Sequence, residues 1–162
     1  MKRRTSAVSL VLVVLAALGL AGSLAAGEQV PFRGRLEGTF AITPVAPTVV
    51  FVLLTGTGEA THLGEFAFTV PHFVDVSTGN GVATGAYQFT AANGDTLFAA
   101  FNGQSTPTTN PDVHHIVETA TITGGTGRFA DATGAFIVDR LINVVTSTTS
   151  GSFDGTISSP GS

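Results

Sequence analysis

The chain has 162 residues, no cysteine and 11% charged residues, with 7 Lys and Arg against 11 Asp and Glu. Its length predicts one ordinary domain with enough residues to bury a core. The lack of cysteine excludes disulfides and a lipid-modified cysteine, so packing must stabilise the fold.

The first 26 residues predict a secretory signal peptide. The chain opens MKRR, continues with an apolar run at 7–20, and then passes through the small residues AGSLAAG. The run is shorter than the roughly 18 apolar residues that a membrane anchor needs, which favours cleavage. We expect the mature chain to begin between Ala26 and Glu28, and the protein to be periplasmic or secreted.

The remaining segment, 27–162, is strongly acidic. This segment contains four arginines and eleven carboxylates, which gives a formal charge of −7. Nucleic-acid binding needs a basic stripe that neutralises phosphates, and anionic membranes attract basic segments. The charge therefore excludes nucleic acid, and predicts no membrane partner once the signal is removed.

Alternating apolar and polar residues predict an all-β domain. Phe66, Phe68 and Val70 alternate with polar or small residues, as on a strand that has one buried face and one solvent-exposed face. The same pattern recurs along the chain between Gly- and Asn-rich turn signals, and a long exposed loop is expected at 102–112. The predicted extended segments are 30–42, 48–55, 64–76, 82–92, 95–101, 113–123, 134–146 and 151–158.

Eight consecutive antiparallel strands can close into a barrel, which removes both sheet edges. A two-sheet sandwich is the alternative architecture. The segment TVVFVLL at 48–54 is apolar on both faces, so we expect its outer face to be covered by a subunit contact.

The stretch at 122–136, ITGGTGRFADATGAF, contains the spacing G-x-G-x-x-A of a dinucleotide site. Such a site needs a long helix after the glycines and an acid about 20 residues later. Gly134 interrupts any helix, and a β-branched segment follows. We therefore expect no cofactor, and a sharp turn in which Phe129 plugs one end of the barrel.

The string GGTGRFADATG at 124–134 resembles the signature of dirigent proteins and of the related allene oxide cyclase barrels. THLGEF at 61–66 and GSFDGTIS at 151–158 are similar to two further blocks of exported bacterial proteins of this type. The resemblance implies an eight-stranded antiparallel calycin-like barrel, often a homotrimer, with a central cavity for hydrophobic molecules. Plant members cyclise an unsaturated epoxide or direct phenoxy-radical coupling, but their catalytic residues cannot be matched outside the glycine block.

Strand parity places two opposite charges inside the predicted barrel. Glu118 shares a face with His114 and Ile116, and Arg140 shares one with Phe136 and further apolar residues. Because a buried charge is costly unless it is paired, we expect these two side chains to contact each other. The pair then has either a purely structural role or the role of a polar anchor in a ligand cavity. Alternatively, a β-bulge turns one of the two side chains outward.

The candidate cavity is assembled from inward-facing residues of several strands. The candidate ligand-binding residues are Glu118, Arg140, Tyr87, Phe66, Phe68, Phe89, Phe101 and His114.

Metal binding and hydrolysis lack a sequence signal. His114 and His115 are adjacent and therefore face opposite sides of a strand, and neither His62 nor His72 stands at a ligand spacing, so we expect no metal. The motif G-x-S-x-G is absent.

Three functions remain open. The first is an exported barrel that binds a hydrophobic small molecule. The second is an isomerase or cyclase in the same cavity, with Glu118 as acid or base and Tyr87 as proton donor. The third is a structural or surface protein whose barrel is packed solid.

Overall fold

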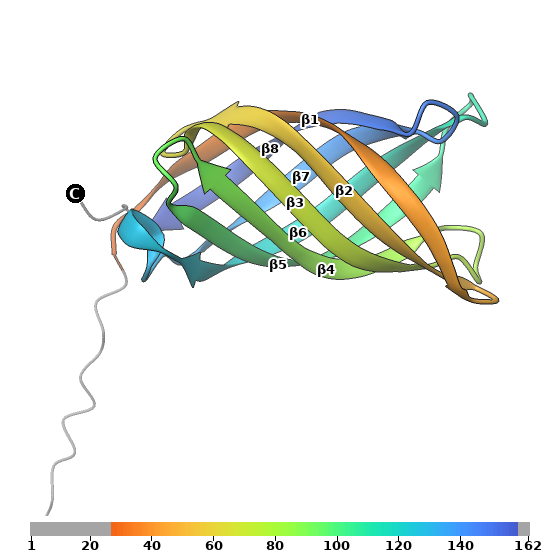
Figure 1. Cartoon of the computed structure of the whole chain (residues 1–162), viewed down its shortest axis with the longest axis horizontal. Coiled ribbons are helices and arrows are strands. Elements are labelled where there is room, and N and C mark those ends of the chain that lie inside the picture. Colours follow the sequence, from red (N-terminus) through yellow and green to blue (C-terminus); the bar gives the residue numbers. More distant parts are fainter. Residues whose placement is uncertain (1–26, 159–162) are drawn as a thin grey trace, which may run out of the picture.

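The computed structural model describes residues 27–158, which form one closed antiparallel barrel (Figure 1). Each strand pairs with the next along the chain, and the first pairs with the last, which excludes the sandwich. The predicted signal peptide, 1–26, lies outside the described residues. The strands are β1 (Gln29–Ala46), β2 (Val49–Ala60), β3 (Gly64–Asp75), β4 (Val82–Ala91), β5 (Thr96–Pro107), β6 (Val113–Gly125), β7 (Gly134–Asn143) and β8 (Thr148–Ser158).

Several strand boundaries differ from the prediction. β2 continues to Ala60, beyond the predicted end at 55, and β5 continues to Pro107, into the expected loop at 102–112. β7 ends at Asn143, before the predicted 146, and β8 starts at Thr148 rather than at 151. Cross-strand pairing overrides the local glycine and proline signals: a Cβ on Gly58 would lie 3.0 Å or less from the Phe66 ring, so this glycine makes room for an inward aromatic side chain.

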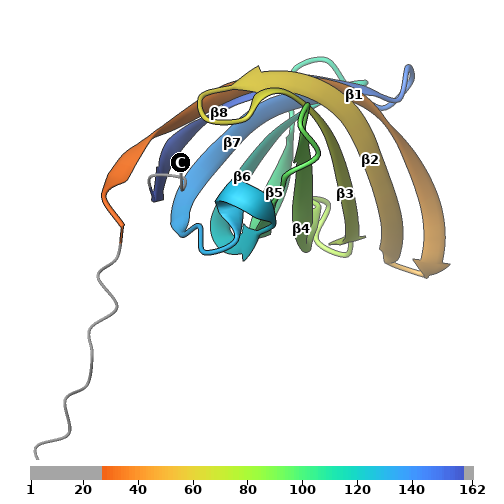
Figure 2. The ribbon, with the colours of Figure 1, turned by 60° about the vertical axis from the view of Figure 1, so that its left-hand side comes forward.

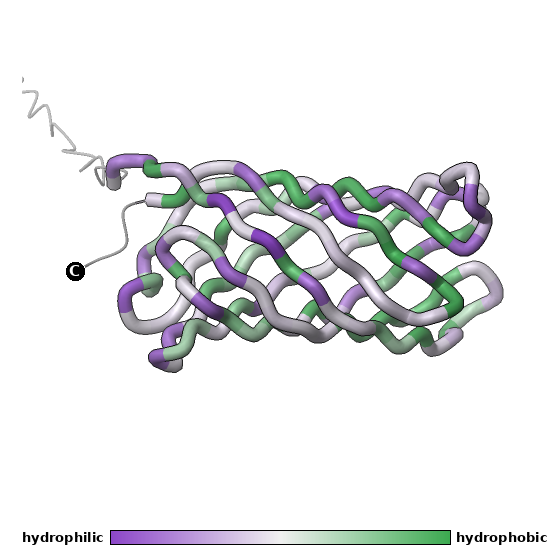
Figure 3. Tube along the Cα trace, turned by 90° about the horizontal axis from the view of Figure 1, so that it is seen from above, coloured by the Kyte–Doolittle hydropathy of each residue, from purple (hydrophilic) through white to green (hydrophobic). Residues whose placement is uncertain are grey.

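Buried and exposed residues alternate along most of each strand. Figure 3 colours the chain by hydropathy and shows hydrophobic and hydrophilic residues interspersed along the barrel wall. On β3, Phe66, Phe68 and Val70 are buried, whereas Glu65, Ala67 and Thr69 between them are exposed. The two-residue period that predicted the fold is therefore the period of the barrel wall. No helix in residues 27–158 is long and apolar enough to cross a membrane.

The outer face of β2 is only partly covered by the chain itself. The rings of Phe51 and Phe73 lie 5.4 Å apart on neighbouring strands, and Phe73 remains 53% exposed. Leu53 is 40% exposed beside them. The predicted subunit contact over this face stays a prediction.

The two ends of the barrel are built differently. One end, which we call the plug end, carries the loops at 61–63, 92–95 and 126–133, the start of β1 and the end of β8. There the short helix η1 (Gly127–Phe129) lies at the barrel end (Figure 2). Phe129 is fully buried in the core, as predicted. The other end, the mouth, carries the loops at 47–48, 76–81, 108–112 and 144–147.

Hydrogen bonds and one aromatic contact fix the glycine block of 124–134. The Thr126 hydroxyl accepts a hydrogen bond from the Thr96 amide at 2.9 Å, and the Arg128 guanidinium donates to the His62 carbonyl at 3.0 Å. The Arg128 guanidinium also lies 4.8 Å from the centre of the Phe129 ring. The block is a structural plug, and a long helix of the kind that a dinucleotide site requires does not follow it within the described chain.

Gly127→Ala tests whether the plug depends on this glycine. Gly127 has φ +55°, and a Cβ there would overlap with the Asp95 carboxylate, which contacts the Arg128 amide. Gly64 also has a positive φ, +67°, but has no atom within 4 Å of its Cβ position. Gly64→Ala should cost about 1–2 kcal/mol through backbone strain alone. Gly127→Ala should cost more; equal shifts of the urea midpoint would contradict this account.

Candidate functional site

The interior of the barrel is divided along its axis into a packed half and a hollow half. Next to the plug, aromatic rings fill the space, and the rings of Phe66 and Phe89 lie 5.3 Å apart in an edge-to-face arrangement. The packed set comprises Phe32, Phe66, Phe68, Phe89, Phe129, Phe136 and Phe153. Toward the mouth, a cavity of about 190 Å³ remains.

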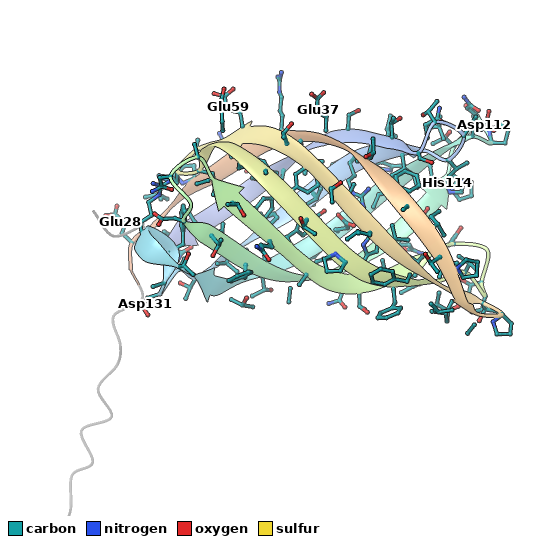
Figure 4. The ribbon with its side chains drawn as sticks, viewed as in Figure 1. Glu28, Glu37, Glu59, Asp112, His114 and Asp131 are labelled. Atoms are coloured by element: carbon teal, nitrogen blue, oxygen red, sulfur yellow. The ribbon has the colours of Figure 1, made fainter. Side chains whose placement is uncertain are left out.

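The wall of the cavity is mainly apolar. It comprises Phe40, Ile42, Val50, Val52, Leu54, Val74, Val76, Ala83, Ile116, Ile142 and Val144. Polar side chains occur at two levels: Glu118, Arg140 and His72 are buried deep in the barrel, whereas Ser105 and His114 are only partly buried. Figure 4 shows His114 near Asp112 at the mouth, and Glu28 and Asp131 at the opposite end.

Glu118 and Arg140 form the predicted ion pair. They lie on the paired strands β6 and β7, with Nη2 of Arg140 2.8 Å from Oε1 of Glu118. Nε of Arg140 donates a second hydrogen bond to Oε2 at 3.2 Å, and Nη1 donates to the Thr149 hydroxyl at 3.2 Å. This fork between guanidinium and carboxylate is the arrangement that best offsets the desolvation of two charges.

Tyr87 completes the network from the packed side. It is fully buried, and its hydroxyl donates a hydrogen bond to Oε2 of Glu118. Burial and the negative charge of Glu118 raise the pKa of Tyr87 well above its ordinary value, so the phenol keeps its proton. Burial disfavours the charged form of Arg140 and is the largest single influence, but the electrostatic interactions and hydrogen bonds with Glu118 and Tyr87 together outweigh it, so the pKa of Arg140 is raised.

His72 lies on β3, and the burial of its side chain is the dominant influence on its pKa. Its Nδ1 is 3.0 Å from the carbonyl oxygen of Val70, and its ring lies edge-on to Phe101 at 5.6 Å. Burial lowers the pKa of His72 below the ordinary value of 6.5, and the smaller effects of Val70 and Glu118 oppose this. His72 is therefore a neutral imidazole at pH 7.

Glycines on adjacent strands make room for the three deep ionisable side chains. Gly103 pairs with Glu118, Gly151 with Arg140, and Gly85 with His72. A Cβ at Gly103 would lie 2.5 Å from Cγ of Glu118, and those at Gly85 and Gly151 would lie even closer to their partners. Without these glycines the narrow barrel could not hold a polar layer at this height.

Three of the eight predicted ligand-binding residues line the cavity: Glu118, Arg140 and His114. The other five, Tyr87, Phe66, Phe68, Phe89 and Phe101, are buried in the core cluster and are absent from the cavity wall. Strand parity shows that a side chain points inward, but does not show how far along the barrel it lies. The aromatic rings pack against one another and close the plug half.

The prediction missed His72 and most of the apolar wall as cavity residues. His72 shares its parity with Phe66, Phe68 and Val70, so the alternation on β3 already placed it inside. Within residues 27–158, no three His, Asp or Glu side chains converge as metal ligands. His115 instead contacts Asp139 on the outer face, with Nε2 and Oδ1 2.9 Å apart.

Comparison with known proteins bears on the fold. No protein-family model matches the sequence, and no curated protein matches it. Among solved structures, a pterocarpan synthase dirigent protein matches with a TM-score of 0.53 and 13% sequence identity, over 93% of this chain and 98% of that chain. The chain has a dirigent-like barrel fold. At this identity the likeness establishes the fold alone, and the function must be argued from the cavity.

A second prediction concerns the buried ion pair. Glu118→Gln keeps the shape but leaves Arg140 buried without a counter-charge, so the unfolding free energy should fall by about 3–5 kcal/mol. The matched control is Asp154→Asn, which removes an exposed pair with Arg33 of similar length, 2.9 Å, and should cost no more than about 1 kcal/mol. Urea unfolding measures the decrease in unfolding free energy for both variants. Similar decreases would show that Glu118 and Arg140 are solvated.

A third prediction concerns His72. The native state binds a proton there less readily than the unfolded chain, whose imidazole has the ordinary pKa of 6.5. The unfolding free energy should therefore fall as the pH drops below 6.5, and His72→Gln should reduce this fall. His62→Gln, an exposed turn residue, should keep the wild-type dependence. The midpoint of urea unfolding, measured between about pH 8 and pH 5, tests this prediction. Identical pH profiles for all three proteins would exclude His72 as the source of the pH dependence.

Proposed function

We propose that this protein is exported and binds a small, mainly apolar molecule in the cavity at the mouth of its barrel. The observation that carries the proposal is the cavity of about 190 Å³, which has an apolar wall and a polar floor whose charges are already paired. Pockets of this composition, with a few placed polar groups, are typical of small-molecule sites. The dirigent-like fold supports the proposal as an analogy.

The cavity volume limits the size of the ligand. It is below the roughly 300–1,000 Å³ of pockets for drug-sized molecules, and slightly above an engineered cavity of about 150 Å³ that holds benzene. The ligand is therefore comparable to one substituted ring, or it is longer and leaves one end outside the mouth. The hollow half also argues against a barrel packed solid, the purely structural alternative.

Binding is better supported than isomerase or cyclase chemistry. A general acid works best when its pKa lies near the operating pH, whereas the pKa of Tyr87 is raised well above 10. The fork from Arg140 occupies both carboxylate oxygens of Glu118, and Tyr87 donates to one of them. These contacts suit a fixed polar floor, and they leave Glu118 poorly placed to exchange protons with a ligand.

Native mass spectrometry of protein purified from its own host tests the proposal. We expect the spectrum to show a retained small molecule. We also expect the polypeptide mass to correspond to a mature chain that begins between Ala26 and Glu28. The same spectrum reports whether the protein is the homotrimer that the exposed face around Phe51, Leu53 and Phe73 would allow.

A pair of variants separates binding in the cavity from binding elsewhere. Ala83 lines the cavity and is 7% exposed, whereas Ala86 is exposed on the same strand. Ala83→Phe fills part of the cavity and should abolish the retained mass, and Ala86→Phe should preserve it. If a folded Ala83→Phe protein still retained the small molecule, the ligand would lie outside the barrel. If the wild-type protein retained no small molecule, the proposal would be refuted.

A further inference from the structure

The deep end of the cavity contains one polar atom that the protein does not satisfy. Nδ1 of His72 lies 3.0 Å from the Val70 carbonyl oxygen, which can only accept a hydrogen bond, so Nδ1 carries the ring proton. In the neutral imidazole, Nε2 then has a free lone pair. Within residues 27–158, no hydrogen bond involves Nε2 of His72.

The unpaired nitrogen is open to the cavity. Every side-chain nitrogen or oxygen of the described chain that is sealed from solvent has a hydrogen-bond partner. His72 is only 5% exposed and lines the cavity, so Nε2, which has no partner, must be reached from the cavity space. This nitrogen can accept a hydrogen bond only from a group inside the cavity, so a ligand with a donor gains a contact there that a ligand without one does not.

The neighbouring charges disfavour an anionic ligand. The guanidinium of Arg140 is compensated by both oxygens of Glu118, so the cavity offers no unmatched positive charge. An anion would have to lose its hydration beside the Glu118 carboxylate without a counter-ion of its own. A neutral molecule meets no such penalty.

We infer that the ligand is a neutral, mainly apolar molecule of about one ring in size whose single O–H or N–H group donates a hydrogen bond to Nε2 of His72. This inference rests on the proposed function, and it names the chemical class of the ligand and its orientation. The donor group points toward the floor, and the apolar part lies against Val52, Val74 and Ile142 on the wall.

Three probes of similar shape test the inference: benzyl alcohol, toluene and benzoate. Toluene lacks the donor, and benzoate replaces it with a negative charge. Calorimetry or ligand-detected NMR at pH 7 gives the three dissociation constants for the mature wild-type protein. We expect both neutral probes to bind and benzoate not to bind.

Two histidine variants locate the acceptor. His72→Phe keeps a ring but removes Nε2, so the affinity for benzyl alcohol relative to toluene should fall roughly tenfold, the effect of one hydrogen bond. His115 lies on the outer face of the barrel, where its Nε2 is 2.9 Å from Oδ1 of Asp139, and it is absent from the cavity wall. His115→Phe should leave the ratio unchanged.

A measurement on the wild type covers the case in which His72→Phe does not fold. The nitrogen-15 resonance of Nε2 in His72 should shift when benzyl alcohol is added, and should shift much less with toluene. An equal response to both probes would overturn the inference.

The outcomes separate the two proposals. An unchanged ratio in His72→Phe, a changed ratio in His115→Phe alone, or binding of benzoate would overturn the inference and leave the binding function standing. If neither neutral probe binds the wild type, both the inference and the proposed function fail.

Discussion

The buried ion pair between Glu118 and Arg140 is the constraint on which the organisation of this barrel depends. Two opposite charges inside a narrow cylinder are tolerated only when nearly all of their hydrogen-bonding capacity is used. Tyr87 supplies a donor from one side, and the Thr149 hydroxyl accepts from Arg140 on the other. The network therefore has a fixed height in the barrel, and the interior on its plug side is filled by buried aromatic and aliphatic side chains.

The same layer determines where the barrel can be hollow. The interior of an eight-stranded barrel is just wide enough to be filled by side chains or to hold one small ligand. Here both cases occur in one molecule, because phenylalanines converge next to the plug and shorter aliphatic residues face the mouth. The polar layer separates the two halves, so a molecule that enters passes Ser105 and His114 near the mouth and then an apolar wall before it reaches the buried ionisable groups.

The sequence contained enough information for the fold and for part of the site. Alternation predicted the strands, and parity on β6 and β7 predicted that Glu118 and Arg140 face each other. Parity did not indicate axial position, since that depends on the stagger between strands and on which neighbours are glycine. The phenylalanines were therefore assigned to the cavity, although they fill the closed half.

The role of His72 was missed for a related reason. Its parity placed it inside, but only the tertiary structure shows that the Val70 carbonyl determines its tautomer and that Gly85 makes room for its ring. The long strands were underestimated because Gly56, Gly58 and Pro107 resemble turn residues when they are considered alone. In the barrel the glycines lie opposite large side chains, and the proline lies at the strand end.

The start of β1 and the end of β8 pair with each other at the plug end, so the described chain enters and leaves the barrel on the side away from the mouth. An attachment made through either of these strand ends would thus present the opening outward. A surface-immobilised or fused form should exchange small molecules with the surrounding medium as freely as the untethered protein, because the tether and the entrance occupy opposite poles.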